Sequence, residues 1–377
     1  MARFDGAVLR ERLDARTDEM VAALGGLVST ESTSGRPDLL ARSAEGLAAL
    51  VERLLGSAPR IVAGAAGSHV HWTGGGTPRV LLVGHHDTVF PEGTVAARPF
   101  RVADGRATGP GVFDMKSGIV QGLFALAELG SPEGVELLVT ADEETGSATS
   151  RDLIVERARA AGAVLVLEPS ADGGALKVGR KGVGTFTVTI VGRASHAGLE
   201  PEKGVNALVE LAAQVPSIAA LSRPELGTTV TPTVASAGTA ENVVPARASI
   251  TVDVRVSSDD ERRRVEDGMA ALVAGLPGAS LSVSGSVSRP PMHESSSTAL
   301  FDAARRAAPS VGLDVLAGVS VGGGSDGNFT AAAGVPTLDG LGAVGGGAHA
   351  DHEWVDVASM GVRAALVAAL VAGLVAG

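Results

Sequence analysis

The first half of the chain alternates short apolar runs with longer segments whose apolar residues recur at helical spacing. The apolar runs cover residues 80–83, 135–139 and 163–167, and the helical segments include 119–129 and 150–160. Apolar strands that alternate with helices are typical of a largely parallel sheet with both faces covered. We therefore predict an α/β domain with a mostly parallel sheet in this part of the chain.

The pattern changes after residue 181. Residues 185–191 alternate strictly, with Phe186, Val188 and Ile190 on one face, which predicts a strand with one buried face. A helix, two strands, a second helix and a last strand are expected next, at residues 205–215, 228–235, 249–256, 259–272 and 281–287. The order β-α-β-β-α-β predicts a ferredoxin-like α+β domain, whose open sheet edge is suited to pairing with another subunit.

The α/β character returns at residues 299–308 and 335–341, so the second pattern is interpreted as an insertion. A chain of 377 residues is also longer than one ordinary domain. We predict a catalytic domain formed by residues 1–180 and 291–377, with residues 181–290 as an inserted lid and dimerisation domain.

Composition narrows the classes of function. The formal net charge is −11 and no dense run of Lys and Arg occurs, which argues against the basic surface that nucleic-acid binding needs. The chain has no cysteine, so disulfides, thiolate nucleophiles and Cys-ligated zinc are excluded. Any metal must therefore be held by His and carboxylate side chains.

Neither end of the chain indicates a membrane segment. Residues 1–24 mix charged and apolar side chains and lack the continuous apolar region of a secretory signal. The apolar stretch 364–377 is shorter than the roughly 20 residues that span a bilayer, which favours a terminal helix docked on the core. We expect a cytoplasmic protein with no membrane partner.

Potential metal ligands follow each of the three apolar runs. The first run ends at His85 and Asp87, the second at Asp142–Glu144 and the third at Glu168. In open α/β sheets, ligands bind outside the carboxyl ends of the strands. These side chains are therefore expected to meet at one edge of the sheet.

For two motifs, a structural explanation stands beside the interpretation as part of a metal site. His85 and Asp87 face the same way on a strand, so the carboxylate can orient a ligating imidazole, although a polar strand end would look the same. Asp114 lies in the turn Gly109–Lys116 ahead of a helix, where its two oxygens could bridge two cations. The alternative for Asp114 is an N-cap, for which Asp is a favoured residue.

The acidic triplet is a stronger signal. Three adjacent acids repel one another, and a metal pair relieves this repulsion while leaving one carboxylate, such as Glu143, free as a general base. A solvated acidic loop is the alternative.

Two further residues could complete the site. Glu168 follows an apolar run, where a lone charge is costly. His349 follows a Gly-rich loop, from which it could close the site.

His196 is flanked by small residues, Ser195, Ala197 and Gly198, that would allow a substrate to approach closely. The remaining histidines have surface or core explanations and are assigned no chemistry: His69, His71, His86, His293 and His352.

Taken in order and spacing, these motifs resemble one family, the dinuclear zinc peptidases and deacylases. The family includes glutamate carboxypeptidase, aminoacylase, acetylornithine deacetylase and succinyl-diaminopimelate desuccinylase. The resemblance covers residues 80–355, and the runs 192–208 and 322–326 look most like the glutamate carboxypeptidase branch.

The resemblance implies a role for each residue of the site. Asp114 would bridge two zinc ions, with His85 and Glu168 completing one site, and Glu144 and His349 the other. Asp87 would orient His85, Glu143 would be the catalytic base, and the Asp114–Met115 peptide bond would be cis. Cobalt or manganese could replace zinc, because His and carboxylate ligands accept all three.

The resemblance also extends to the inserted domain. His196 would stabilise the oxyanion, from its own subunit or from the partner of a homodimer, and Asn242, Arg255 and Arg289 would bind the substrate carboxylate. For Arg255, a cross-strand ion pair with the neighbours of Asp253 is the structural alternative.

The implied activity is hydrolysis of an amide bond adjacent to a carboxylate, in a small peptide or an N-acyl amino acid. The favoured interpretation is a carboxypeptidase that releases C-terminal glutamate or a similar residue. The second is an N-acyl-amino-acid deacylase. The alternative from another class is an inactive dimeric binding protein on the same fold. The segment 349–353 and the absence of tyrosine depart from the family pattern and leave the substrate open.

Overall fold

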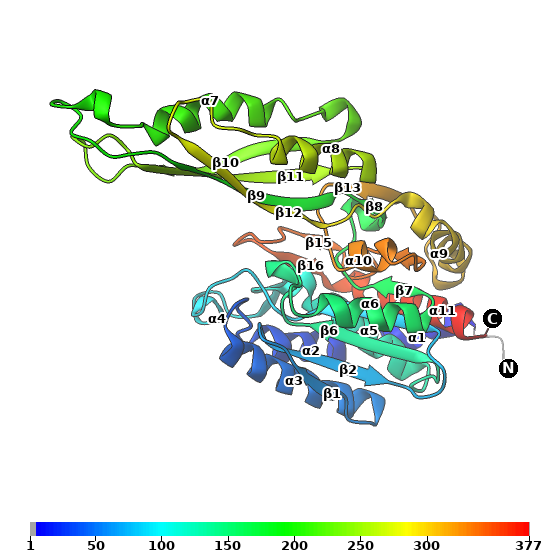
Figure 1. Ribbon diagram of the computed structural model, residues 1–377. Helices are drawn as coiled ribbons and strands as arrows, with labels where there is room; N and C mark the ends of the chain where they lie inside the picture. The colour runs from blue at the N-terminus through cyan, green and yellow to red at the C-terminus, as the bar shows by residue number, and fades with distance from the viewer. Residues whose placement is uncertain (1–4, 377) are drawn as a thin grey trace. The chain divides into compact units, whose positions relative to one another are not determined.

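The computed structural model describes residues 5–376, which form two compact units (Figure 1). The first unit contains the residues up to Gly179, Met292–Val321 and the residues from Ser325 onward. The second contains Arg180–Pro291 and Gly322–Gly324.

The first unit is built on a six-stranded sheet in the order β1-β2-β6-β3-β7-β14. Its strands are β1 (Arg60–Ala63), β2 (Ser68–Thr73), β3 (Val80–His85), β6 (Val135–Thr140), β7 (Val164–Val166) and β14 (Thr337–Leu338). The pairings β6–β3, β3–β7 and β7–β14 are parallel, and every residue of β3 and β6 is buried. Continuous burial along a strand is typical of a parallel sheet covered on both faces.

The sheet is mixed: three of its pairings are parallel, in line with the prediction of a mostly parallel sheet, and two are antiparallel. β1 and β2 pair antiparallel with each other, and β2 pairs antiparallel with β6. The connection between β1 and β2 is a tight turn, in which Gly64 and Gly67 exchange backbone hydrogen bonds. A turn this short joins only antiparallel neighbours, whereas a parallel pair needs a long crossover.

Helices cover both faces of this sheet. Alternate residues of β3 enter different cores, since Leu82 packs in one buried cluster and Leu81 and Val83 in the other. The larger cluster includes residues from α1 (Gly6–Asp14), α2 (Thr17–Val28), α3 (Pro37–Leu55), α5 (Ser117–Glu128), α9 (Glu294–Ala307) and α11 (Met360–Ala376). The smaller cluster is covered by α6 (Arg151–Ala161).

The C-terminal helix α11 packs against α1 and α5, as expected for a terminal helix docked on the core. Together with the turn before it, the segment Val357–Ala376 is long and apolar enough to cross a membrane, yet 61% of it is buried inside the protein. Within α11, Arg363 is buried and donates hydrogen bonds to the backbone carbonyls of Gly174, Gly340 and Gly342. These features are those of a core helix.

A small antiparallel sheet in the first unit holds two loops of the site. Its order is β15-β16-β5-β4, with β15 (Gly345–Gly346), β16 (Trp354–Asp356), β5 (Arg106–Thr108) and β4 (Arg101–Ala103). The loop that carries His349 connects β15 to β16, and the turn that carries Asp114 follows β5. The pairing of β16 with β5 therefore brings these two segments to the same place.

The second unit has the element order β-α-β-β-α-β around an antiparallel sheet in the order β10-β11-β9-β12. Its elements are β9 (Gly182–Val191), α7 (Ala207–Ala219), β10 (Thr229–Ala237), β11 (Arg247–Val256), α8 (Asp259–Ala270) and β12 (Ser280–Arg289). Phe186, Val188 and Ile190 lie in its buried cluster, as the alternation predicts.

Candidate metal centre

In the first unit, candidate metal ligands lie at the carboxyl ends of the parallel strands, along one edge of the sheet. His85 is the last residue of β3, the turn Glu143–Thr145 follows β6, and Glu168 follows β7. Neighbouring parallel strands end on the same side of the sheet, so these side chains meet there. Asp114 reaches the same place from the π-helical turn Val112–Lys116.

Asp114 is not the N-cap of α5. Its backbone is non-helical, and the helix begins three residues later, at Ser117. The Asp114–Met115 peptide bond is cis, as the family resemblance implies.

A first group of ligand atoms forms around His85. Its Nε2 atom lies 3.3 Å from Asp114 Oδ1 and 3.4 Å from Glu168 Oε1. One ligand atom from each of the three residues lies within 4.8 Å of the others. All three come from different elements, so only the fold brings them together.

A second group shares Asp114. Nε2 of His349 lies 3.4 Å from Asp114 Oδ2 and 3.2 Å from Glu144 Oε2. Asp114 therefore presents one carboxylate oxygen to each group. A carboxylate with this arrangement is suited to bridge two cations.

The donor set fits a pair of divalent cations. Among residues 5–376, three buried atoms of these groups have no hydrogen-bond partner: His85 Nε2, Asp114 Oδ1 and Glu144 Oε1. A buried polar atom without a partner is costly, and a pair of metal ions would satisfy all three. Imidazole nitrogen and carboxylate oxygen are ligands of zinc, and also of cobalt and manganese.

The charges of the site favour cations as well. The Asp114 and Glu144 carboxylates raise the pKa of His349 to about 10. Burial opposes protonation of His85, yet the carboxylates of Asp114, Asp87 and Glu168 still raise its pKa well above the usual value. The carboxylates around the two histidines thus favour positive charge at this place, which divalent cations would supply.

Asp87 contacts both His85 and the acidic turn. The closest partner of His85 Nδ1 is the backbone carbonyl of Asp87, at 3.0 Å, while the Asp87 carboxylate lies 3.4 Å away. A hydrogen bond donated by Nδ1 leaves Nε2 unprotonated and free to bind a metal. The fully buried Asp87 carboxylate also accepts hydrogen bonds from the backbone N–H groups of Glu143 and Glu144 and from Ser34 Oγ.

Glu143 lies beside the first group but belongs to neither set of ligand atoms. Its side chain is buried, and Oε2 lies 4.0 Å from His85 Nε2. The acidic triplet is therefore not a solvated loop, because Asp142 and Glu143 are buried and the Glu144 side chain is only 7% exposed. The Glu143 carboxylate therefore lies next to the ligand atoms without being one of them.

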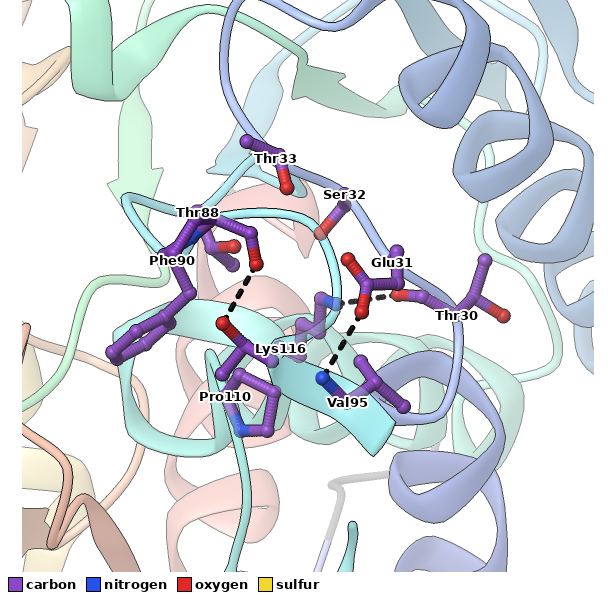
Figure 2. Close-up of a pocket in the computed structure, with 11 residues that line it drawn as sticks. Thr30, Glu31, Ser32, Thr33, Thr88, Phe90, Val95, Pro110 and Lys116 are labelled. Atoms are coloured by element: carbon purple, nitrogen blue, oxygen red, sulfur yellow. Dashed lines mark hydrogen bonds between the residues drawn. The ribbon is translucent and has the colours of Figure 1, made fainter. Parts of the chain in front are cut away.

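Two charged residues near Asp114 were missed by the sequence analysis. Glu353 accepts hydrogen bonds from the backbone of the Asp114 turn. Lys116 is buried, and its ammonium group donates hydrogen bonds to the carbonyls of Leu27 and Thr30, the second of which is drawn in Figure 2. Burial lowers the pKa of Lys116 to about 8. The spacing of Glu353 four residues after His349 is the one sequence signal that could have drawn attention to it.

In the second unit, His196 and Asn242 lie close together, because the Ala197 N–H donates to the Asn242 carbonyl. His196 is exposed, and its Nδ1 accepts hydrogen bonds from the backbone N–H groups of Gly198 and Leu199, each at 3.1 Å. A neutral imidazole that accepts at Nδ1 carries its proton on Nε2. This nitrogen is therefore a donor.

Arg255 and Arg289 lie on either side of β9, since both pair with Val183 in the sheet. Arg255 forms two hydrogen bonds with the carboxylate of Asp253 on its own strand, at 3.0 and 2.9 Å. Arg255 is thus held in an ion pair, but the partner is Asp253 on its own strand and not a residue of a neighbouring strand, as the structural alternative had it. Arg289 is buried at the end of β12.

Comparisons with known proteins agree with this geometry. The sequence model described as Peptidase family M20/M25/M40 matches residues 81–373. Carboxypeptidase G2 from Pseudomonas sp. (strain RS-16) is 35% identical over 299 residues, which cover 76% of this chain and 72% of that enzyme. Succinyl-diaminopimelate desuccinylase from Wolinella succinogenes is 29% identical over 227 residues, or 56% of this chain and 60% of that enzyme.

A solved structure gives the same fold. The M20 family metallo-carboxypeptidase Sso-CP2 from Sulfolobus solfataricus superposes with a TM-score of 0.77 at 17% identity, covering 96% of this chain and all of that one. The resemblance inferred from the order of the motifs is thus confirmed at the level of the family.

Proposed function

The chain belongs to peptidase family M20/M25/M40, and from this premise we propose that it uses two metal ions to cleave an amide bond adjacent to a carboxylate. The observation that carries the proposal is the position of Asp114. One of its oxygens faces His85 and the other faces His349, so a single carboxylate serves two groups of ligands. The other ligands are Glu168 in the first group and Glu144 in the second.

We propose zinc as the native metal, which is consistent with ligands that are all imidazole or carboxylate. When bound, the two ions supply Lewis-acid polarisation of the substrate carbonyl and lower the pKa of a water molecule toward neutrality. His85 and His349 bind through Nε2, and Asp87 keeps His85 in the tautomer that leaves this atom free.

Glu143 is the general base in this proposal. Its carboxylate takes the proton of the attacking water and later gives it to the leaving amide nitrogen. The nearby Asp87 carboxylate holds the backbone of the turn that carries Glu143, so the base is held in position. The Nε2–H of His196 is the oxyanion donor.

For the substrate, we favour a peptide with a C-terminal glutamate or a similar residue. The choice of a carboxypeptidase over a deacylase is supported by 35% identity over 72% of carboxypeptidase G2, against 29% over 60% of a desuccinylase. Asn242, Arg255 and Arg289 are the candidate receptors for the substrate carboxylate. The guanidinium of Arg255 also binds Asp253, so a substrate carboxylate would compete with this ion pair. Deacylation of N-acyl amino acids is the second candidate activity.

A panel of amides separates these activities. We expect the enzyme loaded with zinc to release the C-terminal residue of N-acylated dipeptides ending in Glu or Asp, at least tenfold faster than it hydrolyses N-acetyl or N-succinyl amino acids. The readout is the free amino acid formed per unit time. Preference for the N-acyl amino acids would favour the deacylase, and hydrolysis of none would support the inactive binding protein.

We further propose that residues 181–290 act as a lid and dimerisation domain. Within the part of the chain that the structure describes, β10 is an edge strand that pairs only with β11, and Val234 on it is 64% exposed. An unpaired, exposed edge is suited to contact with a second copy of the chain. In such a homodimer, His196 could serve the active site of the partner subunit.

Mixed dimers test this sharing of His196. We expect both pure variants, His196→Ala and Glu143→Ala, to be inactive, and the mixture to recover up to about one quarter of wild-type activity, because one intact site then forms in each mixed dimer. Activity is measured after the two proteins are unfolded and refolded together. No recovery, despite mixed dimers seen by native mass spectrometry, would mean that His196 acts within its own subunit.

A further inference from the structure

The carboxylate of Glu353 accepts hydrogen bonds from three backbone N–H groups of the turn that carries Asp114. Its Oε1 atom accepts from Phe113 and Asp114, both at 2.8 Å, and its Oε2 atom accepts from Gly111 at 2.9 Å. Glu353 is only 1% exposed. A buried carboxylate that accepts several backbone hydrogen bonds fixes the segment that donates them.

This turn has little room to adopt another conformation. Gly111 has φ +73°, a left-handed conformation, and a Cβ atom placed on it would lie 2.5 Å from Thr88 Cγ2. The next residues, Val112–Lys116, form a single irregular turn whose middle is non-helical. The N–H group of Asp114 is thus held by a side chain from another part of the chain rather than by a helix.

Backbone hydrogen bonds also tie Glu353 to the loop that carries His349. Its own backbone N–H donates to the carbonyl of Ala350 at 3.2 Å, and the Ala350 N–H donates to Gly347 at 2.9 Å. The next residue, Trp354, pairs with Gly346 on one side and with Thr108 on the other. Glu353 therefore lies where the His349 loop meets the Asp114 turn.

We propose that Glu353 is a positioning residue for the metal centre, which holds the shared ligand Asp114 and the His349 loop in their relative place. The inference rests on the ligand set of the proposed function. Glu353 contacts the backbone of Asp114 and not the ligand oxygens, so it acts through Asp114. Hydrogen bonds around the ligands of a metal centre change metal affinity or activity by about 10–100-fold when they are removed.

Glu353→Gln is the sharpest variant, because it keeps the size of the side chain. The amide has one acceptor oxygen in place of two, and its NH₂ group would face a backbone N–H. Asp351→Asn is the matched control, since it removes an acid from the same loop whose side chain is 92% exposed and lies next to Arg98. Glu353→Asp keeps the charge but shortens the reach, and serves as a second variant.

The test is a titration of each metal-free protein with Co²⁺, followed by the visible absorption of the bound ion. We expect the dissociation constant to rise about 10–100-fold in Glu353→Gln, by a smaller factor in Glu353→Asp, and less than twofold in Asp351→Asn. Equal affinities for wild type and both Glu353 variants would overturn the inference, as would an equal loss in Asp351→Asn. Failure of the wild-type protein to bind two ions would instead overturn the proposed function.

Discussion

Replacing Glu143 with Gln is expected to lower kcat/KM by about 10²–10⁴-fold, the range typical of a lost general acid–base group. The amide keeps the shape of the side chain but cannot take a proton from water or return it to the leaving nitrogen. Since Glu143 belongs to neither group of ligand atoms, the protein should still bind its metal ions. The loss should therefore appear in kcat.

Glu156→Gln is a suitable control for this variant. Glu156 is an acid on the surface of α6 in the same unit, 68% exposed and paired with Arg157, so its loss should leave kcat/KM within about twofold of wild type. Metal content is measured in parallel for all three proteins. Turnover at the wild-type rate by Glu143→Gln would show that another group moves the proton.

Asp114→Asn is expected to lower both metal content and activity. The amide has only one oxygen, so it cannot offer an oxygen to the His85 group and another to the His349 group. Two-metal sites contribute several kcal/mol of transition-state stabilisation, and loss of this contribution lowers kcat/KM on the order of 10³-fold.

The two variants are distinguished by their metal content. We expect Asp114→Asn to retain at most one ion per chain after dialysis against a weak chelator, whereas Glu143→Gln retains the wild-type amount. The ions are counted by inductively coupled plasma mass spectrometry. An Asp114→Asn protein that kept two ions would exclude Asp114 as the bridging ligand.

Much of the site follows from sequence because it depends on the ends of buried strands. The runs before His85, Asp142 and Glu168 are almost wholly apolar, and the charged or imidazole side chain that follows each run marks the edge of the sheet. The structure brings His85, Asp114 and Glu168 together, and likewise Asp114, Glu144 and His349. Asp114 and His349 lie on irregular segments, where the local pattern left their roles open, and the order of the motifs across the family assigned those roles.

Other features depend on tertiary contacts that leave little trace in the sequence. The strands 60–63 and 68–73 are short and partly exposed, and their antiparallel pairing follows from a turn rather than from a hydrophobic pattern. Glu353 is one acid within a polar loop, and its burial arises only when that loop folds against the Asp114 turn. Similarly, the ion pair of Arg255 with Asp253 depends on the rotamers of two half-buried side chains on one strand.

The central claim is that His85, Asp114, Glu144, Glu168 and His349 together hold two divalent ions. The most direct test is to remove all metal from the wild-type protein, add Zn²⁺ in measured equivalents, and follow bound metal and amide hydrolysis together. We predict that binding saturates at two ions per chain and that activity is absent from the metal-free protein and returns as the ions bind. Full activity without metal, or saturation below two ions, would contradict the account.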